Sequence, residues 1–482
     1  MTSKRTLPRN LWIVFITLLM ACGSFPQEQT VNPAQTNTPV FTPVMATDTP
    51  RGPWATNTPL GTTNGTTSAV ASPTAAQPTV PPRIMGKQPP ACTFPLAQIT
   101  AVEPTPEEYT FSEPKVVLTA PSGNLYRIVE WLPDNQQVLM TENLRGNYVE
   151  NNSNDPQQSI SLYNPEKGKS KVYAIHAETD EPPLWQPGLK AVMYPTMNYF
   201  DIDRKNKTYK LTRQIWVSYG NPDTVQILDD NLPQLSLAIK PDGSGMLYLS
   251  DKKISKLDKS LKKLPPISLD LAQWDYAQDR RDDRPVSYKM AWQPGTALIF
   301  LYSEGGNGGG GYTFILDTDS GHICELKLEG WAFVAHWSSD GRYLAFITSK
   351  NYALPTYSAE LTLLDSITGN LNTLTVIPQE VKWEHYVQGF TWAPDNRHLL
   401  AIENIFLPRK SPDESSNAQW LLYLVDGISG QSVNVEPEYK NFTSSANNSL
   451  AWSPDGSKLV THCPGKQIDQ ICLISVQRVG HP

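Results

Sequence analysis

Short apolar runs with a period of two recur along the chain from about residue 115 onward. Examples are Leu298 to Tyr302 and Tyr343 to Ile347. Each run is bounded by residues typical of tight turns, such as Pro, Asp and Gly. This pattern predicts β-strands joined by hairpins, and therefore an all-β fold.

One turn sequence returns repeatedly, each time after an apolar strand that ends in Trp or Ile. The copies are Trp131-Leu-Pro-Asp134, Trp185-Gln-Pro-Gly188, Ile239-Lys-Pro-Asp242, Trp292-Gln-Pro-Gly295, Trp337-Ser-Ser-Asp340, Trp392-Ala-Pro-Asp395 and Trp452-Ser-Pro-Asp455. Successive first positions lie 54, 54, 53, 45, 55 and 60 residues apart. This period is typical of propeller blades and not of helical solenoids. We expect the Trp side chains to pack between neighbouring sheets as core residues; an aromatic binding track is the alternative.

A second turn pattern, Asp or Asn followed four residues later by Gly, lies within several repeats. It is found at Asn164 to Gly168, Asp317 to Gly321, Asp365 to Gly369 and Asp426 to Gly430. Together the two turns predict four strands per repeat. The second, third and seventh repeats lack a clear second turn.

The two ends of the repeat array complement each other. The last repeat has too few strands, whereas Lys115 to Thr119 is an additional strand before the first repeat. Pairing this strand with the last repeat would remove two exposed sheet edges. We therefore expect a seven-bladed β-propeller of four-stranded antiparallel blades, closed by the N-terminal strand.

The units of the type Trp452-Ser-Pro-Asp-Gly456 resemble the WD-like repeats of TolB-type β-propellers, over about residues 115 to 476. The resemblance implies the architecture and no particular function. Such propellers occur in periplasmic scaffold proteins, in front of peptidase domains and in many secreted bacterial proteins. The chain departs from TolB in its lipid-anchor type of N-terminus and in having no separate domain before the propeller.

Residues 1–22 have the features of an export signal. Basic residues precede an apolar run from Leu11 to Met20 that is too short to span a bilayer comfortably. The tetrad Leu19-Met-Ala-Cys22 resembles a bacterial lipobox, in which Cys22 would become the lipidated first residue. An ordinary signal peptide and an uncleaved anchor are the alternatives.

Residues 23–90 are rich in Thr, Pro, Asn and Ala and cannot bury a core. We interpret them as an extended, disordered stalk that holds the propeller, residues 91–482, away from a membrane. These features predict an extracytoplasmic, membrane-anchored lipoprotein, on the cell surface or facing the periplasm.

The four cysteines other than Cys22 are expected to form disulfides, because the chain has an export signal and their number is even. Cys463 and Cys472 flank a short loop between two predicted strands. Cys92 and Cys324 are the remaining pair, whose bridge would attach the end of the stalk to the fourth repeat. A metal site is the alternative, but no Cys-x-x-Cys supports it.

The formal net charge is −7 and no stripe of Lys and Arg stands out, which argues against nucleic-acid binding. The glycine run Gly305 to Gly311 lacks the ending of a phosphate loop. We expect no cofactor and no metal, and membrane contact only through the lipid anchor.

The two turn types are separated by two strands, so both should lie on one face of the ring, with the longer connections on the other. Those connections include Tyr199 to Tyr209, Asp270 to Val286 and Pro378 to Gln388. Two of them combine aromatic rings with charged groups, which suits a sugar or a protein partner. The candidate ligand-binding residues are Trp274, Tyr276, Arg280, Arg281, Asp282, Asp283, Trp383, Glu384, His385 and Tyr386. A self-satisfied ion-pair cluster and packing at the rim are the alternative interpretations.

The sequence contains no Gly-x-Ser-x-Gly, no His-Glu-x-x-His and no defensible Ser-x-x-Lys set. His336 and His398 adjoin repeat motifs and are predicted to be structural. The leading hypothesis is a non-catalytic lipoprotein whose propeller binds a protein or glycan through the face with the long connections. A propeller-fold glycan hydrolase or lyase that uses Asp282, Asp283 or Glu384 is one alternative. A structural scaffold of an envelope complex is the other, and the oligomeric state stays open.

Overall fold

The computed structural model describes a large part of the chain between residues 89 and 479. The described residues are 89–99, 104, 107–121, 124–143, 158–176, 181–203, 208–229, 232, 236–250, 253–269, 288–303, 312–328, 330–349, 359–374, 376, 385–406, 418–435, 439–440, 450–463 and 470–479. All regular elements within these ranges are β-strands. The predicted signal peptide, Cys22 and the stalk lie outside the described residues, apart from the stalk's last two residues. Within the described part, no helix is long and apolar enough to cross a membrane.

The strands form a series of antiparallel sheets that follow one another along the chain. The first sheet contains β3 (Leu125–Trp131), β4 (Val138–Asn143), β5 (Gln158–Asn164) and β6 (Lys169–His176). The next contains β7 (Leu184–Gln186), β8 (Ala191–Asp203), β9 (Thr208–Ser218) and β10 (Val225–Asp229). It is followed by β11 (Leu237–Ile239), β12 (Gly245–Ser250), β13 (Lys253–Asp258) and β14 (Lys263–Ser268), and then by β15 (Tyr288–Trp292), β16 (Leu298–Ser303), β17 (Thr313–Asp317) and β18 (Ile323–Glu325).

The following strands belong to one larger sheet that consists of two antiparallel parts. The first part contains β19 (Trp331–Trp337), β20 (Tyr343–Ser349), β21 (Ala359–Asp365) and β22 (Leu371–Leu374). The second contains β23 (His385–Trp392), β24 (His398–Phe406), β25 (Ala418–Asp426), β26 (Ser432–Asn434) and the short β27 (Tyr439–Lys440). A single parallel pair, Ala359 with Tyr386, joins the two parts.

The last sheet combines both ends of the described chain. It contains β28 (Leu450–Trp452), β29 (Lys458–His462) and β30 (Gln470–Val479), together with β1 (Glu108–Phe111) and β2 (Lys115–Thr119). β2 pairs with the first half of β30, which is the pairing that the sequence analysis expects, and β1 pairs with the second half. The additional strand β1 was not predicted.

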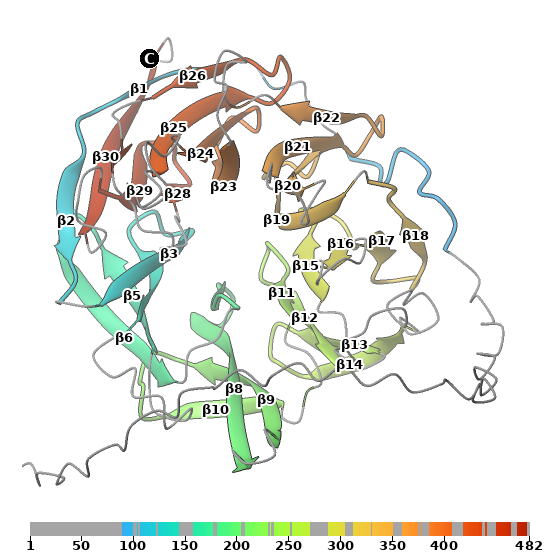
Figure 1. Ribbon diagram of the computed structural model, residues 1–482. Coiled ribbons are helices and arrows are strands. Elements are labelled where there is room, and N and C mark those ends of the chain that lie inside the picture. The colour runs from blue at the N-terminus through green and yellow to red at the C-terminus, as the bar shows by residue number, and fades with distance from the viewer. Residues whose placement is uncertain are drawn as a thin grey trace, which may run out of the picture. The chain divides into compact units, whose positions relative to one another are not determined.

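The sheets lie around a common centre, with the first strand of each sheet innermost and the last strand outermost (Figure 1). Apolar side chains alternate toward both sheet faces, so each sheet must bury both faces against its neighbours. The arrangement is that of a β-propeller.

The tight turns that contain an Asp are held by it, as the turn sequence predicts. The Oδ1 atom of Asp134 accepts the backbone N–H of Gln136 at 2.9 Å, and the Oδ1 atom of Asp455 accepts that of Ser457 at 2.9 Å. The glycine of the turn is required at Gly341, which has a φ of 77°. A Cβ there would lie 2.7 Å from the carbonyl oxygen of Pro294, so no other residue fits without displacement.

Three of the repeat tryptophans, Trp131, Trp337 and Trp392, link neighbouring sheets through their indole N–H groups. Nε1 of Trp337 donates to the carbonyl of Ala291 at 3.2 Å, and Nε1 of Trp392 donates to that of His336 at 2.9 Å. Each acceptor residue lies on the first strand of the preceding sheet and directly precedes the Trp of that strand. Trp131, Trp337 and Trp452 are buried, with 6, 8 and 6% exposure, which supports the core interpretation of these positions.

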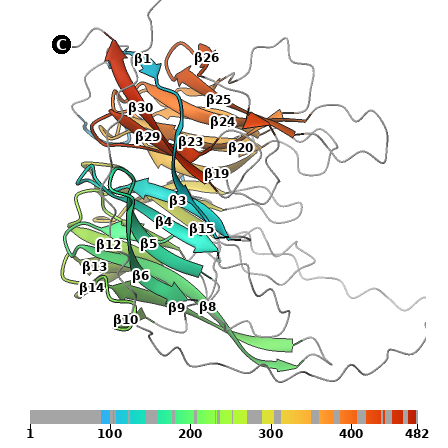
Figure 2. The same cartoon turned by 90° about the vertical axis from the view of Figure 1, so that its left-hand side faces the viewer.

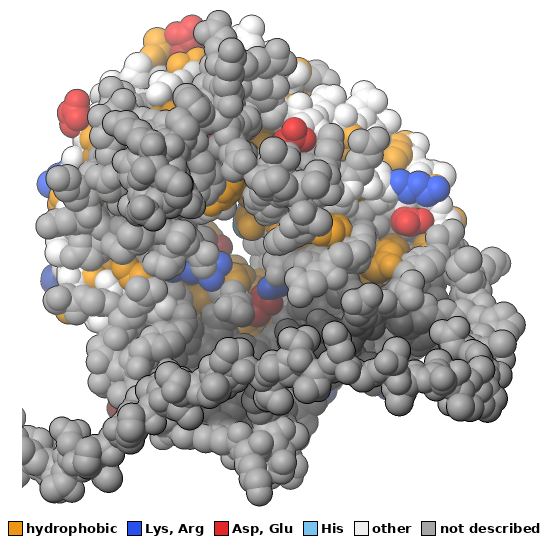
Figure 3. All heavy atoms as spheres, in the orientation of Figure 1, with side chains coloured by type: hydrophobic (Ala, Val, Ile, Leu, Met, Phe, Trp, Pro, Cys, Tyr) orange, Lys and Arg blue, Asp and Glu red, His pale blue; other side chains and the backbone are white. Residues whose placement is uncertain are grey.

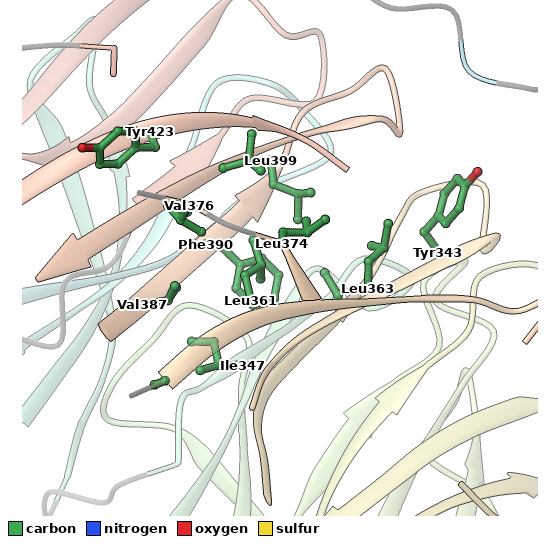
Figure 4. Close-up of a cluster of buried hydrophobic side chains, with 14 of the residues drawn as sticks. Tyr343, Ile347, Leu361, Leu363, Leu374, Val376, Val387, Phe390, Leu399 and Tyr423 are labelled. Atoms are coloured by element: carbon green, nitrogen blue, oxygen red, sulfur yellow. The ribbon is translucent and has the colours of Figure 1, made fainter. Parts of the chain in front are cut away.

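Apolar clusters fill the spaces between successive sheets. Figure 4 shows the cluster between the β19–β22 part and the β23–β26 part, where Leu361 and Leu363 of one part pack with Val387, Phe390 and Leu399 of the other. Fully burying a Leu or Phe side chain contributes about 1.5–3 kcal/mol. These interfaces therefore hold the ring together.

A segment that we call the N-terminal belt, the described residues between 89 and 119, crosses the last four sheet units. At its start Cys92 forms a disulfide with Cys324 of β18, and its N–H donates to the carbonyl of Glu325 at 3.0 Å. The N–H of Leu96 then donates to the carbonyl of Ser366 at 2.8 Å.

Further along, the belt reaches the last two sheet units. The ring of Tyr109 lies edge-on to His398 and to Trp452, with centroid distances of 5.7 and 5.1 Å. Glu107 pairs with Arg478 of β30, with 3.2 Å between Oε2 and Nε. The belt therefore fastens four consecutive sheet units before the first sheet begins at β3.

Both predicted disulfides are present. Cys92 is bonded to Cys324, and Cys463 is bonded to Cys472. Disulfides form and persist in oxidising compartments, which fits an extracytoplasmic protein.

Candidate functional site

The two predicted turn types lie on the same face of the ring. Nη2 of Arg342, after the tight turn of its sheet, is 3.3 Å from Oδ2 of Asp365 at the second turn. The equivalent pair in the next sheet, Arg397 with Asp426, has 2.6 Å between Nη2 and Oδ2. We call this face the turn face. The opposite face is the loop face, where β8 and β9 extend beyond the other strands in Figure 2.

One predicted loop on the loop face is largely strand. β8 continues to Asp203 and β9 begins at Thr208. These two residues are paired. The expectation of a loop from Tyr199 to Tyr209 was therefore wrong. Aromatic and β-branched residues in this stretch favour extended backbone, so the hairpin continues outward.

The turn face was also incompletely predicted. The Oδ1 atom of Asp258 accepts the N–H groups of Ser260 and Lys262 at 2.8 and 3.0 Å, which forms a second turn in the third repeat. Leu261 takes the left-handed conformation there, with a φ of 64°. The turn escaped detection because Gly is the usual sign of that conformation.

Side chains on the turn face are largely used to hold turns and the belt. His398 is 8% exposed and its Nδ1 atom lies 2.5 Å from Oδ2 of Asp395, so its predicted structural role is confirmed. Burial alone would raise the pKa of Asp395, but the hydrogen bonds from His398 and Arg397 outweigh it and lower the pKa. Ser339 and Asn396 join two neighbouring turns, with 2.8 Å between the N–H of Ser339 and Oδ1 of Asn396.

The loop face has a different character at its centre. Figure 3 views this face and shows a hollow between the innermost strands, with acidic and basic side chains on its walls. We call it the central hollow. The innermost strands carry the partly exposed polar residues Arg127 and Glu130 on β3, Lys289 on β15 and Gln388 on β23, and the exposed His336 on β19.

Glu130 is the acid on the wall formed by β3 and β7. Its Oε1 atom accepts the backbone N–H of Trp185 at 3.1 Å, so the carboxylate lies between two innermost strands. Burial raises the pKa of Glu130 to about 7, against the smaller lowering effect of the Trp185 hydrogen bond. The group therefore changes its charge close to neutral pH.

A second pair of charges joins elements that are not neighbours in the ring. Nζ of Lys289 on β15 bonds Oε1 of Glu181, which precedes β7. Two sheets, β7–β10 and β11–β14, lie between Glu181 and Lys289 in the chain. Their side chains are 16 and 17% exposed.

His336, on β19, packs against the next sheet. Its ring lies edge-on to Phe390 at 5.5 Å, and its nitrogens bond none of the residues that the structure describes. Desolvation by the surrounding protein lowers the pKa of His336. It is a neutral donor and acceptor at physiological pH.

Polar residues also recur in the second strand of most sheets, in the part directed toward the loop face. They stand eleven positions after the first residue of the repeat, at Glu142, Thr196, Ser303, Thr348 and Glu403. Glu403 is 1% exposed, as is the adjacent Asn404, whose Nδ2 atom donates to the hydroxyl of Tyr386 at 2.8 Å. The hydrophobic core thus gives way to a polar layer beneath the loop face.

The structure tests few of the predicted ligand-binding residues. Trp274, Tyr276, Arg280, Arg281, Asp282, Asp283, Trp383 and Glu384 lie outside the described residues. His385 and Tyr386 begin β23, and Tyr386 is brought next to Asn404. The sequence analysis missed Glu130, although an acid directly before Trp131 in an apolar strand was a detectable sign.

Among the residues described, no group of three or more His, Cys, Asp or Glu side chains is arranged to hold a metal ion.

The chain is similar to several solved structures, all at low sequence identity. No family model and no curated protein matches the chain. Similar solved structures include a protein assigned as TolB from Agrobacterium tumefaciens, with 15% identity and a TM-score of 0.36, over 67% of this chain and 98% of that one. Oligogalacturonate lyase in complex with manganese has 9% identity and a TM-score of 0.37, over 78% and 84% of the two chains. A protein assigned as a 6-phosphogluconolactonase from Bacteroides fragilis has 13% identity and a TM-score of 0.38, over 74% and 94%. These neighbours include β-propeller proteins, and the low identities and TM-scores carry no argument about activity or ligand.

Proposed function

We propose that the chain is a non-catalytic, lipid-anchored extracytoplasmic protein whose β-propeller, with seven blades, binds a protein or glycan partner through its loop face. The anchor is Cys22, and the stalk of residues 23–90 separates the propeller from the membrane. Two disulfides support the oxidising compartment.

The observation that carries the choice of face is the different use of polar side chains on the two faces. On the turn face Asp395, Asp426 and Arg397 are engaged in bonds that hold the turns. On the loop face Tyr386, at the start of β23, is partly exposed beside Asn404. Binding residues commonly lie on connections that a rigid scaffold presents, and accessible polar groups in a hollow supply orientation and specificity.

The test replaces Trp383 and Tyr386 together by Ala in the full exported protein. Partners are first captured by crosslinking on intact cells, and binding of each purified partner is then measured. We expect binding to fall at least tenfold. A matched control, Ile428→Ser, changes a side chain on the turn face that is 42% exposed and should leave binding unchanged.

Equal binding by the Trp383/Tyr386 variant and the wild type, for every captured partner, would contradict the proposed face. Turnover of a polysaccharide panel that is lost on changing Asp282, Asp283 or Glu384 would contradict the non-catalytic assignment. Metabolic labelling with a radioactive fatty acid tests the anchor: the label should appear in the wild type and be absent from Cys22→Ala.

A further inference from the structure

Two strands of the second sheet extend far beyond their neighbours. β8 has 13 residues and β9 has 11, whereas the second strands of the other sheets, β4, β12, β16, β20, β24 and β29, have 5 to 9. β7 pairs with β8 only up to Met193, and β10 pairs with β9 only from Ile215. We call the remainder, residues 194–203 of β8 and 208–214 of β9, the hairpin arm (Figure 2).

The hairpin arm is a ribbon of two strands, with no third strand beside it in the part of the chain that the structure describes. One backbone bond reaches its β9 side, from the N–H of Leu232 to the carbonyl of Arg213 at 3.0 Å. Along β8 the arm is roughly 30 Å long, at about 3.3 Å per residue. An isolated two-stranded ribbon is only marginally stable in water, so an arm of this length is expected where another chain completes it.

The free edge of the arm is that of β8, on the side where β7 ends. Pro195 pairs with Ile215 although it has no N–H, so its position in β8 is one that does not donate to β9. Because backbone groups alternate along a strand, Met197 and Tyr199 have the same orientation, with N–H and C=O directed away from β9. No described strand pairs with these groups.

Several outer edges of the ring are protected, in contrast to the arm. β18 is bridged by the belt through Ala91 and Glu325, and β30 pairs with β1 and β2. β14 contains Pro265 and Pro266, which prevent the addition of a strand. An edge that lacks such protection is a template for pairing with another chain.

The charge of the arm indicates which chain would pair there. The sequence from Asp201 to Arg213 contains five basic and two acidic residues, whereas the whole chain has a net charge of −7. Two such arms repel each other, which disfavours pairing with a second copy, and an acidic segment is attracted. A lipid surface offers no partners for the unpaired backbone groups of the edge.

We propose that the free edge of β8, around Met197 and Tyr199, binds an acidic, extended segment of a partner protein that adds to the sheet as a strand. This inference rests on the proposed function, because the arm lies on the loop face, and it names the class of partner. Main-chain hydrogen bonds supply the affinity in this mode of recognition, and the basic residues of the arm select an acidic segment.

The experiment is a titration of a fluorescently labelled octapeptide, in which Glu and Val alternate, with the full exported protein. Binding is followed by fluorescence anisotropy. We expect saturable binding of this peptide, and we expect it to weaken as salt is added, because screening reduces the attraction between opposite charges. An octapeptide in which Lys and Val alternate is the control and should not bind.

A pair of variants at one position tests the backbone edge. Met197→Pro removes an N–H of the free edge and leaves the bonds between β8 and β9, so it should weaken binding at least tenfold. Met197→Ala retains this N–H and should bind as the wild type does. Lys210→Glu tests the charge without changing the edge and should also weaken binding at least tenfold. Far-ultraviolet circular dichroism and thermal melting establish that the variants are folded.

Absence of binding by the Glu peptide at millimolar concentration, or equal affinity of wild type and Met197→Pro, would overturn the inference. Two further results would replace the proposed partner by another. Sedimentation velocity that shows a dimer in the wild type and a monomer in Met197→Pro would identify a second copy. Binding to phosphatidylglycerol vesicles that is lost in Lys210→Glu, without binding of the Glu peptide, would identify a membrane.

The two proposals fail in distinguishable ways. If the Trp383/Tyr386 variant loses its captured partner while Met197→Pro binds the Glu peptide as the wild type does, the proposed function stands and this inference fails. If Met197→Pro and Lys210→Glu lose the peptide while the Trp383/Tyr386 variant keeps its captured partner, the proposed function fails in its choice of residues and the strand-binding edge stands.

Discussion

The indole Nε1 of Trp131 donates to the carbonyl of Ala451 at 2.9 Å, and this bond joins the first strand of the first sheet to the first strand of the last sheet. The two residues are 320 positions apart. The same bond, from a Trp to the residue before the preceding Trp, recurs between sheets that are adjacent in the chain. The bond that closes the ring is thus of the same kind as the bonds that join β19 to β15 and β23 to β19.

Replacing Trp131 by Phe should therefore weaken the closure of the ring. The change leaves the carbonyl of Ala451 without this donor and removes part of a buried ring, at a cost of about 1–3 kcal/mol. The measurement is the free energy of unfolding from urea denaturation. Trp292→Phe is the control, because its indole donates to Thr296 within its own sheet at 3.1 Å. A larger loss for Trp292→Phe than for Trp131→Phe would contradict the closing role.

Glu130→Gln should stabilise the free protein above pH 7. Burial raises the folded pKa of Glu130 from its usual 4.5 to about 7, so its contribution to stability is fully present below pH 4.5 and is lost as pH rises through 7. The variant should melt at a higher temperature than the wild type at pH 8 and at a similar temperature at pH 5. The difference at pH 8 should be on the order of 1–3 kcal/mol. A wild-type advantage at pH 8 would show that Glu130 is paired in the folded state.

Asp426→Asn should destabilise the protein at neutral pH. Burial alone would raise the pKa of Asp426, but the Arg397 guanidinium and the N–H groups of Ile428 and Ser429 outweigh it and lower the pKa to about 2. The stabilisation is therefore present above about pH 4 and is lost as pH falls toward 2. We expect a loss of about 2 kcal/mol at pH 7 that disappears near pH 2, measured by chemical denaturation. A loss of unfolding free energy that is independent of pH would contradict a stabilising role of the Asp426 charge.

Removing the Cys92–Cys324 bridge should loosen the belt before it affects the sheets. In a double Ser variant, limited proteolysis should cut within residues 93–107 while the rest of the propeller stays resistant. The cost in stability should be about 2–5 kcal/mol, and larger than for the Cys463/Cys472 double Ser variant, because the bridged positions are 232 and 9 residues apart. Equal protease resistance with and without the Cys92–Cys324 bridge would show that the other contacts of the belt suffice to hold it against the sheets.

The repeat and the Cys463–Cys472 disulfide could be predicted because each depends on local signals, whereas Cys92 and Cys324, 232 positions apart, were predicted as the remaining pair. Asp455 and Gly456 specify their turn within a few residues, and Cys463 and Cys472 are close in sequence. Leu261 shows the limit of such signals, since its left-handed turn is stabilised by Asp258 without the usual Gly.

The path of the belt and the role of Glu130 depend on contacts between distant parts of the chain. Nothing in the sequence around Tyr109 indicates that its ring reaches both His398 and Trp452. Likewise the raised pKa of Glu130 arises from the wall that β7 completes, which its own strand cannot reveal. Residues that respond to their three-dimensional surroundings are therefore the ones that sequence patterns miss.

The pairing of the belt with β30 also sets an order of events during biosynthesis. Ser112 and Ser475, which exchange hydrogen bonds, are 363 positions apart, so β1 and β2 are synthesised long before their partner strand exists. Closing so long a segment is entropically costly and makes folding slow. Until the last strand emerges, β2 has a free edge that is open to pairing with another chain. We therefore expect folding of this protein to depend on factors that prevent unpaired nascent strands from associating with other chains. A propeller closed by strands adjacent in sequence would depend on them less.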